Sequence, residues 1–361
     1  MKFGIWTPLP HTVAPEPRMV AAVSNLSRPG AGEGTDDSFQ MAVDILKKGE
    51  AHGFSTTLVA ARHLGPDLEA WTLATALAMH TSAIEIMVAT HPGIIQAQMV
   101  AKLGASLDRL SNGRLALNVV NGWNVEEFET FGNSAWQRSE EERYQRMDEF
   151  IQVIRGLWES DPFTFNGQYY RVKESRLPLK PRQTPHPPIY AASRSPEGKK
   201  TIARFCDHWF PPDLGDFRKP RETLAFIASK MDDMRSLAHS FGNKVGFGLS
   251  AHVVCEKTEE CAAEKAVMLE EHGRKARYNK SAVAALGACL VGTAQTIAER
   301  VCAYEDAGLD LLLLQFNPMG EGLDRFLSEV LPLVEKRRGR IAADTQSVRR
   351  SYQDAGSNAA E

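Results

Sequence analysis

The 361-residue sequence has few cysteines, little net charge and no long apolar run. Its five cysteines are an odd number and no two form a C-x-x-C pair, which argues against a disulfide framework and against a redox or zinc motif of that type. The formal net charge of −3 gives no support to nucleic-acid binding. No spacing of His, Cys and Asp resembles a metal site, so no bound metal is expected.

Signals for a membrane or for secretion are also missing. No apolar stretch approaches the length of a membrane-spanning helix. The opening residues MKFGIWTPLP lack the apolar segment of a secretory signal. We therefore expect a reduced, soluble, cytoplasmic protein with neither membrane nor nucleic acid as a partner.

Short β-rich runs alternate with helical patterns along most of the chain. Eight runs are typical of buried strands: KFGIW, TTLVAA, IEIMVAT, GRLALNVV, PPIYAA, DHWFPP, VGFGLSAHVV and LDLLLLQF. With helices between them and no break in composition, they predict an α/β protein, a (β/α)8 TIM barrel with insertions. An open doubly wound sheet is disfavoured, because no G-x-G-x-x-G turn follows the first strand.

The chain divides into a barrel and a tail. We expect a single barrel domain over residues 1–341 and a polar tail over residues 342–361. Within the barrel, FTFNGQYYRV contains Asn166-Gly167 and predicts a two-stranded hairpin. Ser139 and Glu142 form a capping box at the start of a long helix.

The stretch IYAASRSPEG, which begins at Ile189, raises the possibility of a phosphate site. Ser195 before Pro196 is typical of a helix start, so a simple N-cap is one interpretation. The other is that the backbone N–H groups of this helix start hold a phosphate, assisted by Ser195 and Arg194. The barrel favours the second, because the phosphate sites of such barrels use late loops and a helix N-terminus.

Histidines cluster where the predicted strands end. His63, His91 and His252 fall at or near the carboxyl ends of three strands, with Asn118 inside a fourth. A single histidine there is more often a hydrogen-bonded core residue, but several on one rim favour proton transfer near neutral pH. We expect His252, His91, His63 and Asn118 to be the catalytic candidates.

Arg143 and Tyr144 follow the predicted helix start at Ser139. One interpretation is an exposed arginine beside neighbouring glutamates. The other is a cation and a phenol that meet a phosphate. A cation opposes the dipole at a helix N-terminus unless an anion is present, which favours the second.

Three segments carry a family resemblance: SLDRLSNGRLALNVVNGWNVEEFETFG, ERYQRMDEFIQVIRGLW and FNGQYYRV. They resemble the bacterial luciferase-like flavin monooxygenases, and the nearest branches are FMNH2-dependent alkanesulfonate, dimethylsulfone and pyrimidine monooxygenases. The later segment LVGTAQTIAERV is similar to the same family. The resemblance extends from KFGIWTPLP to VLPLVEK, which is most of the chain.

The resemblance implies an activity. It implies a TIM barrel that binds reduced FMN supplied by a separate NAD(P)H-dependent flavin reductase. It implies O2 activation to a flavin peroxide and oxygenation of a small sulfone, sulfonate or N-heterocycle. A homodimer or homotetramer is implied as well.

The resemblance also assigns residues. His252 falls where alkanesulfonate monooxygenases carry an active-site histidine. The cofactor-binding positions that it carries over are Ala61, Arg62, Asn118, Glu127, Arg143, Tyr144 and Ser195.

The sequence departs from the family pattern at two positions and in one segment. Ala191-Ala192 replaces the usual Gly-Gly before the phosphate serine, and Ser250 replaces an arginine of the alkanesulfonate branch. The segment between the seventh and eighth strands is too short for the long lid that the alkanesulfonate branch carries there. A sulfonate would therefore need a substitute cation from Arg62 or from residues 18–34. The candidate covers of the site are residues 7–34 and 274–288.

Two other functions fit the same barrel. A deazaflavin-dependent enzyme would transfer a hydride, and it would not consume O2 with reduced FMN. A non-catalytic flavin-binding barrel would retain oxidised FMN through purification, which two-component oxygenases release readily.

Overall fold

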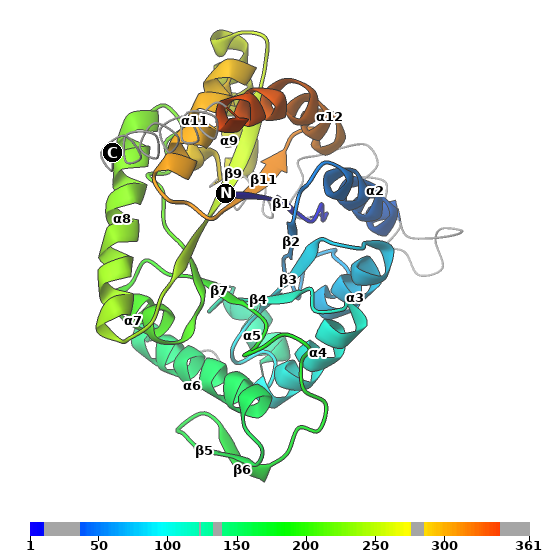
Figure 1. Cartoon of the computed structure of the whole chain (residues 1–361), viewed down its shortest axis with the longest axis vertical. Coiled ribbons are helices and arrows are strands. Elements are labelled where there is room, and N and C mark those ends of the chain that lie inside the picture. The colour runs from blue at the N-terminus through cyan, green and yellow to red at the C-terminus, as the bar shows by residue number, and fades with distance from the viewer. Residues whose placement is uncertain (11–36, 123, 133–138, 276–284, 340–361) are drawn as a thin grey trace, which may run out of the picture.

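A closed barrel of eight parallel strands forms the centre of the computed structural model, which describes all residues except 11–36, 123, 133–138, 276–284 and 340–361. Each strand pairs with the next, and the pairing of β8 with β9 closes the ring (Figure 1). The expected TIM barrel is confirmed. Its strands are β1 (Lys2–Trp6), β2 (Thr56–Val59), β3 (Glu85–Thr90), β4 (Leu115–Val119), β7 (Ile189–Ala192), β8 (His208–Phe210), β9 (Gly246–Cys255) and β11 (Leu311–Phe316).

Helices surround the ring (Figure 1). They are α2 (Asp37–Ala51), α3 (Ala70–His80), α4 (Ala97–Leu110), α5 (Val125–Phe131), α6 (Glu140–Glu159), α7 (Pro196–Phe205), α8 (Pro220–Ser240), α9 (Glu259–Lys275), α11 (Ala294–Asp306) and α12 (Met319–Arg325), which continues into a π-helical turn, η2 (Phe326–Val330). Their buried faces pack on the outer face of the ring, as Leu46 of α2 and Phe150 of α6 do.

Side chains alternate between the inside of the ring and its helical coat, as strand geometry requires. On β11, Leu311 and Leu313 belong to the inner cluster, whereas Leu312 and Leu314 belong to the outer core. The barrel is therefore packed from within, as TIM barrels are, and its inward side chains near the carboxyl ends of the strands are positioned by this alternation.

Smaller elements decorate the barrel. The expected hairpin consists of β5 (Phe163–Asn166) and β6 (Arg171–Ser175), which form an antiparallel pair against α6. Beside β9 lies the two-residue strand β10 (Val291–Gly292), which follows a buried 3-10 turn, η1 (Ala285–Ala288). Residues 274–288 were a candidate cover of the site. Their last four, residues 285–288, are buried within the fold and do not form an exposed cover.

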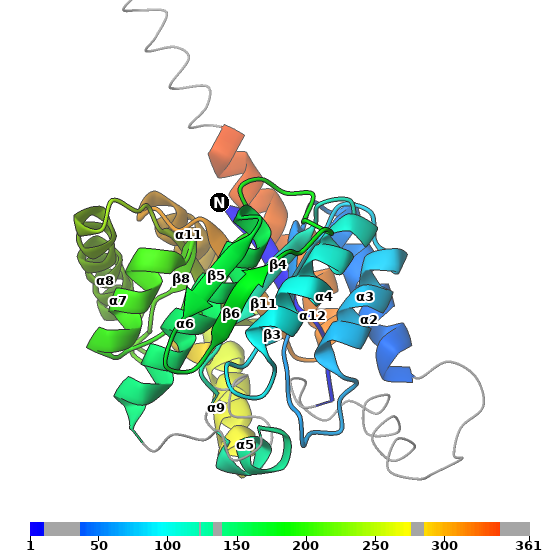
Figure 2. The same cartoon turned by 90° about the horizontal axis from the view of Figure 1, so that it is seen from below.

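The short helix α5 was not predicted from the sequence, where its residues follow the fourth strand as a loop. Its N-cap is Asn124, whose side chain accepts the N–H of Glu126 at 3.2 Å. Helices α5 and α9 lie at one end of the barrel, opposite the end at which the chain begins (Figure 2).

Several expectations fall outside the described residues. They include most of the long segment of residues 7–34 and the polar tail of residues 342–361. Among the described helices, none is long and apolar enough to cross a membrane.

Candidate active site

The predicted site residues lie at or after the carboxyl ends of the barrel strands, the end that α5 faces. Active sites of TIM barrels form at this end, because the loops that follow the strands converge there. We call this end the mouth of the barrel. The predicted residues form three groups around it: a rim cluster after β2 and β3, a helix start after β7, and inward-facing side chains on the strands themselves.

Arg62 and Glu127 form the charged half of the rim cluster. Arg62 follows β2, Glu127 lies on α5, and Arg62 Nε is 3.4 Å from Glu127 Oε1. The Glu127 side chain is 5% exposed and also accepts the backbone N–H of Leu64 at 3.4 Å. Helix α5 therefore delivers a buried carboxylate that balances the Arg62 guanidinium at the rim.

His63 and His91 form the second half of the rim cluster. His63 Nε2 is 3.1 Å from His91 Nδ1, and the two rings meet edge to face. Burial, with the nearby His63 and Arg62, lowers the pKa of His91 to about 3. Burial also lowers the pKa of His63, although Glu127 and Glu69 oppose that shift. The pair is therefore neutral at pH 7, and one ring donates a hydrogen bond to the other.

Ser195 is the N-cap of α7, the first of the two interpretations of this stretch. Its Oγ accepts the N–H of Gly198 at 3.1 Å. Ser193 Oγ accepts the N–H of Ser195 at 3.1 Å and lies 3.3 Å from Ser195 Oγ. Two hydroxyls thus meet at a helix start that follows β7 at the mouth, an arrangement suited to an anion.

Gly198 permits this arrangement. A Cβ at Gly198 would lie 2.1 Å from Ser193 Oγ and 2.4 Å from a ring carbon of Tyr144. Tyr144, only 8% exposed, therefore packs directly on the first turn of α7. Arg143 is half-buried on the first turn of α6. The sequence reasoning nominated Ser195 and Tyr144 but not Ser193 or Gly198.

Asn118 and His252 face into the barrel. Asn118 is register-paired with Ala89 of the inner cluster, and its Oδ1 is buried without a hydrogen-bond partner. His252 on β9 is 3% exposed and pairs in register with Gln315 on β11. Ala61, after β2, packs against the same inner cluster. These side chains share the interior of the mouth rather than its rim.

Buried polar atoms without a partner gather at this end of the barrel. Besides Asn118 Oδ1, they include Thr90 Oγ1, Asn121 Nδ2 and both amide atoms of Gln315. Native structures leave few such groups, and a bound molecule is one reason for those that remain. Thr90, Asn121 and Gln315 are not among the site residues predicted from the sequence, because burial without a partner leaves no mark in a sequence.

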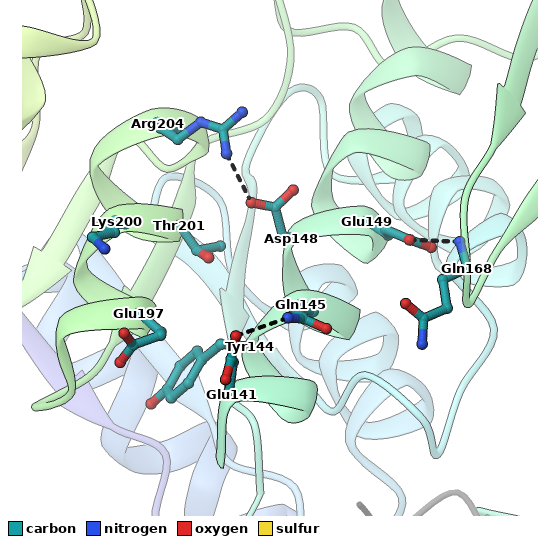
Figure 3. A pocket seen from close by; sticks show the side chains of 10 residues that line it. All are labelled: Glu141, Tyr144, Gln145, Asp148, Glu149, Gln168, Glu197, Lys200, Thr201 and Arg204. Atoms are coloured by element: carbon teal, nitrogen blue, oxygen red, sulfur yellow. Dashed lines mark hydrogen bonds and ion pairs between the residues drawn. The ribbon is translucent and has the colours of Figure 1, made fainter. Parts of the chain in front are cut away.

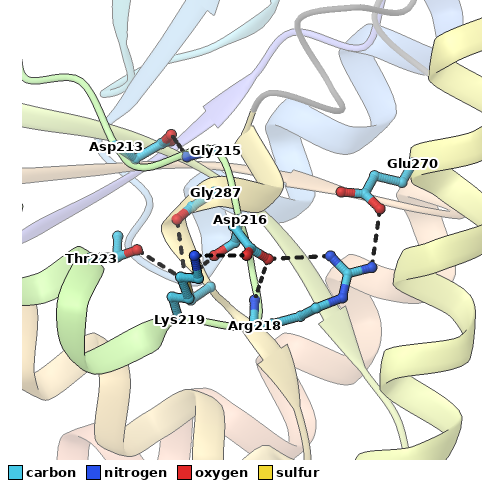
Figure 4. Close-up of polar contacts among 9 residues, drawn as sticks. Asp213, Gly215, Asp216, Arg218, Lys219, Thr223, Glu270 and Gly287 are labelled. Carbon is cyan, nitrogen blue, oxygen red and sulfur yellow. Dashed lines mark hydrogen bonds and ion pairs between the residues drawn. The ribbon is translucent and has the colours of Figure 1, made fainter.

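The loop after β8 follows a strand end at the same end of the barrel, and Figure 4 shows its polar contacts. Asp213 accepts the N–H of Gly215 at 2.8 Å, and a Cβ at Gly287 would lie 2.3 Å from its Oδ1. Burial raises the pKa of Asp213, while the Gly215 N–H and the charge of Arg194 oppose the rise. Asp213 thus links this loop electrostatically to Arg194 in the loop that contains Ser195.

A groove of about 450 Å³ lies beside this site, between α6, α7 and the hairpin (Figure 3). It is lined by Glu141, Tyr144, Gln145, Asp148, Glu149, Gln168, Glu197, Lys200, Thr201 and Arg204. Arg204 is already engaged with Asp148 at 3.4 Å. With four carboxylates against two cations, the groove does not suit the phosphate of a flavin. Tyr144 and Glu197 are the lining residues next to the start of α7.

The described residues contain no group of three or more His, Cys, Asp or Glu side chains placed to hold a metal ion. What they do contain is suited to an anionic and hydrogen-bonding ligand. Two hydroxyls and a helix start offer an anion site, neutral imidazoles can accept or donate a proton, and inward amides offer unsatisfied hydrogen bonds.

Comparison with known proteins identifies relatives of this chain. The family model of luciferase-like monooxygenases matches residues 1–311. The FMNH2-dependent dimethylsulfone monooxygenase of Pseudomonas putida is 31% identical over an alignment of 309 residues, which covers 76% of this chain and 82% of the relative. The corresponding enzyme of Pseudomonas fluorescens (strain Pf0-1) is 31% identical over an alignment of 338 residues, which covers 84% of this chain and 88% of the relative.

Solved structures share the fold. EDTA monooxygenase from Chelativorans sp. BNC1 superposes with a TM-score of 0.72 at 18% identity, covering 93% of this chain and 94% of that protein. At that identity the likeness concerns the barrel and its insertions, and the substrate must be argued from the site.

Proposed function

Since the chain belongs to the luciferase-like monooxygenase family and is a flavin-dependent monooxygenase that uses reduced FMN and O2, we propose that it oxygenates a small uncharged molecule such as a sulfone. The observation that carries the proposal is the neutral, hydrogen-bonding interior of the mouth. Two relatives named for dimethylsulfone support the same choice.

The inward side chains argue for an uncharged substrate. Near the carboxyl ends of the strands they include Trp6, Asn118, Ser250, His252 and Gln315, none of which has a fixed charge. Trp6 Nε1 donates to Ser250 Oγ at 3.2 Å, in the place where the alkanesulfonate branch carries an arginine. A buried sulfonate would need a cation to offset its desolvation.

Arg62 is poorly placed to serve as that cation. It already faces the buried carboxylate of Glu127 at 3.4 Å. A sulfonate beside this pair would be repelled by Glu127, and the pair would have to separate for Arg62 to bind it. The expectation that Arg62 substitutes for the missing arginine is therefore not part of this proposal.

The residues present fit reduced FMN. The hydroxyls of Ser193 and Ser195 and the start of α7 would hold the phosphate, with Tyr144 packed behind them and Arg143 nearby. When bound, the flavin supplies the electrons that activate O2.

The rest of the FMN site would lie on the strands and at the rim. Ala61, Arg62, Asn118 and Glu127 would flank the ring system, and the orphaned Asn118 Oδ1 would accept a hydrogen bond from it.

The histidines would transfer protons. His91 is buried and neutral, and it contacts the more exposed His63, so the pair offers a route for a proton between the rim and the interior. His252 would act within the interior, beside the substrate. Because these groups are buried, little water can reach them, and an oxygenation site must exclude water.

Three further features belong to the proposal. A separate NAD(P)H-dependent reductase would supply reduced FMN, since the chain resembles enzymes named for FMNH2. A single barrel domain would span residues 1–341. Assembly into a homodimer or homotetramer stays a prediction, which sedimentation velocity tests directly.

The test is a single-turnover assay. Anaerobically reduced FMN is mixed with the protein, then with 18O2-saturated buffer containing dimethyl sulfone, methanesulfonate or a pyrimidine. Mass spectrometry is expected to find one 18O atom in the product of dimethyl sulfone. Oxygenation of methanesulfonate alone would overturn the choice of an uncharged substrate, and failure to bind reduced FMN would overturn the site.

A variant sharpens the test. Ser250→Arg restores the cation that the alkanesulfonate branch carries, so it should shift the preference from dimethyl sulfone towards methanesulfonate. Its affinity for FMN, measured in parallel, shows that the barrel is intact. An unchanged preference would mean that charge at this position does not select the substrate.

A further inference from the structure

Gln315 is buried on the inner face of the barrel at the mouth. Its side chain is 3% exposed. On β11 it follows Leu311 and Leu313 at two-residue spacing, and both leucines belong to the inner cluster. Because alternate residues of a strand share a face, the Gln315 amide points into the interior of the ring.

Neither polar atom of the Gln315 amide has a hydrogen-bond partner in the structure, although both are buried. A primary amide offers two donors and two acceptor sites, so the whole capacity of this group is unused. Leaving a buried polar group unsatisfied costs free energy, more than the group's removal would. The amide therefore weakens the protein that contains no ligand.

The fold itself does not require an amide at this position. The preceding inward residues of β11 are leucines that pack within the ring. A methionine would fill nearly the same volume as glutamine without a polar atom to satisfy. The retention of an amide is thus better explained by a bound molecule than by packing.

The residue next to Gln315 on the neighbouring strand indicates which molecule the Gln315 amide contacts. His252 lies directly opposite on β9, also inward and 3% exposed. Ser193 and Ser195, which would hold the phosphate, follow β7, and β7 and β11 are separated by β8 and β9 on one side of the ring. Gln315 is therefore away from the phosphate end of the cofactor and beside a candidate proton donor.

We propose that Gln315 is a specificity-determining residue that donates a hydrogen bond from its Nε2 to an oxygen of the uncharged substrate and so holds it next to His252. The inference rests on the proposed function and names a residue of the same site that the sequence did not single out.

The test compares Gln315→Met with Gln295→Met. Gln295 is an exposed glutamine of α11, outside the mouth, that donates to Glu299 at 2.8 Å. Three quantities are measured: the Tm of the FMN-free protein, the Kd of FMN, and the KM for dimethyl sulfone. Gln315→Met is expected to raise Tm by about 2 °C, to raise KM about tenfold, and to leave the Kd of FMN within twofold. Gln295→Met should change none of them appreciably.

Each alternative outcome is distinct. A lower Tm for Gln315→Met would show that the amide serves the fold, which overturns the inference. A tenfold weaker FMN affinity with an unchanged KM would assign the amide to the cofactor, which also overturns it. Wild-type protein that binds FMN but leaves dimethyl sulfone unoxygenated would overturn the proposed substrate, and the Tm comparison would still decide whether the amide is structural.

Discussion

The two ends of the barrel differ in how most of their buried polar groups are satisfied, although His208 Nδ1 at the start of β8 also lacks a partner. At the amino end, Asp108 is fully buried and its two carboxylate oxygens accept four hydrogen bonds, from the N–H groups of Leu115, Arg182 and Gln183 and from the Gln183 amide. At the mouth, Asn118 Oδ1 and both amide atoms of Gln315 have no partner.

Arg114 repeats the pattern of the amino end. Its guanidinium donates five hydrogen bonds, three to the carbonyls of Ala78, Thr81 and Ile84, one to Thr81 Oγ1 and one to the carbonyl of Ser111. Saturated groups of this kind join the loops that precede β3 and β4 and so stabilise the fold. Unsatisfied groups at the mouth destabilise the ligand-free protein, as expected where a bound ligand supplies the missing hydrogen bonds.

The largest effect expected from this contrast is on stability. Asp108→Ala would leave three backbone N–H groups without their acceptor and remove one of the two hydrogen bonds that the Gln183 amide donates. The free energy of unfolding should therefore fall by about 3 kcal/mol or more. Urea unfolding measures it. FMN affinity below the transition should be unchanged, because the site is at the other end.

The control for Asp108 is an exposed carboxylate. Asp232 pairs with Arg235 at 2.6 Å on the surface of α8, and Asp232→Ala should cost about 0.5 kcal/mol or less. Equal losses for the two variants would erase the distinction between the amino end and ordinary surface.

The mouth should respond in the opposite sense. Asn118→Leu removes an unsatisfied oxygen, so thermal unfolding should occur at an equal or higher temperature, while single-turnover oxygenation falls at least tenfold. A clear loss of stability together with unchanged turnover would place Asn118 with the saturated groups of the amino end.

The sequence predicted the scaffold better than the site. All eight strands follow from short β-rich runs such as LDLLLLQF, because a buried parallel strand needs an apolar residue at nearly every position. The start of α7 was predicted as well, because Ser195 before Pro196 is a local signal. Local chemistry therefore sufficed wherever neighbours in sequence make the structure.

Pairings between distant residues were beyond the sequence. The contact of His63 with His91 joins residues that follow two successive strands, and Arg62 meets Glu127 only because α5 folds back over the rim. The close approach at Gly198 depends on Tyr144 of another helix. No spacing encodes these contacts, so the residues could be nominated one by one but not assembled into groups.

A smaller effect concerns the pH dependence of stability. His91 has a pKa of about 3 in the folded protein and about 6.5 when unfolded, so the unfolded chain binds the extra proton below pH 6.5. This histidine should therefore lower the free energy of unfolding by about 1.4 kcal/mol for each pH unit below that value. His91→Asn should flatten the decline measured by urea unfolding at pH 7, 6 and 5.

At the amino end, Glu50 should lose its contribution to stability only at lower pH. Burial raises the pKa of Glu50, but the N–H groups of Ala83, Ile84 and Ser82, with Arg114, bring it below its ordinary value of 4.5. Its stabilising contribution is present above pH 4.5 and is lost as pH falls through the lower folded value. The exposed His52→Asn serves as control for His91→Asn, and a similar flattening in both would rule out His91 as the source.

The smallest expected effect concerns the phosphate. Ser195→Ala removes both a helix cap and, as we propose, a phosphate contact. Thr293→Ala removes the cap of α11, where Thr293 accepts the N–H of Thr296 at 3.3 Å, and the hydrogen bond from the Thr293 hydroxyl to Glu259, but no proposed phosphate contact. Both variants should lose about 1 kcal/mol of stability. Only Ser195→Ala should weaken FMN binding, by about fivefold. Riboflavin has no phosphate, so its affinity should be the same for the two variants. If Ser195→Ala weakened riboflavin binding as much as FMN binding, the serine would shape the mouth without contacting the phosphate.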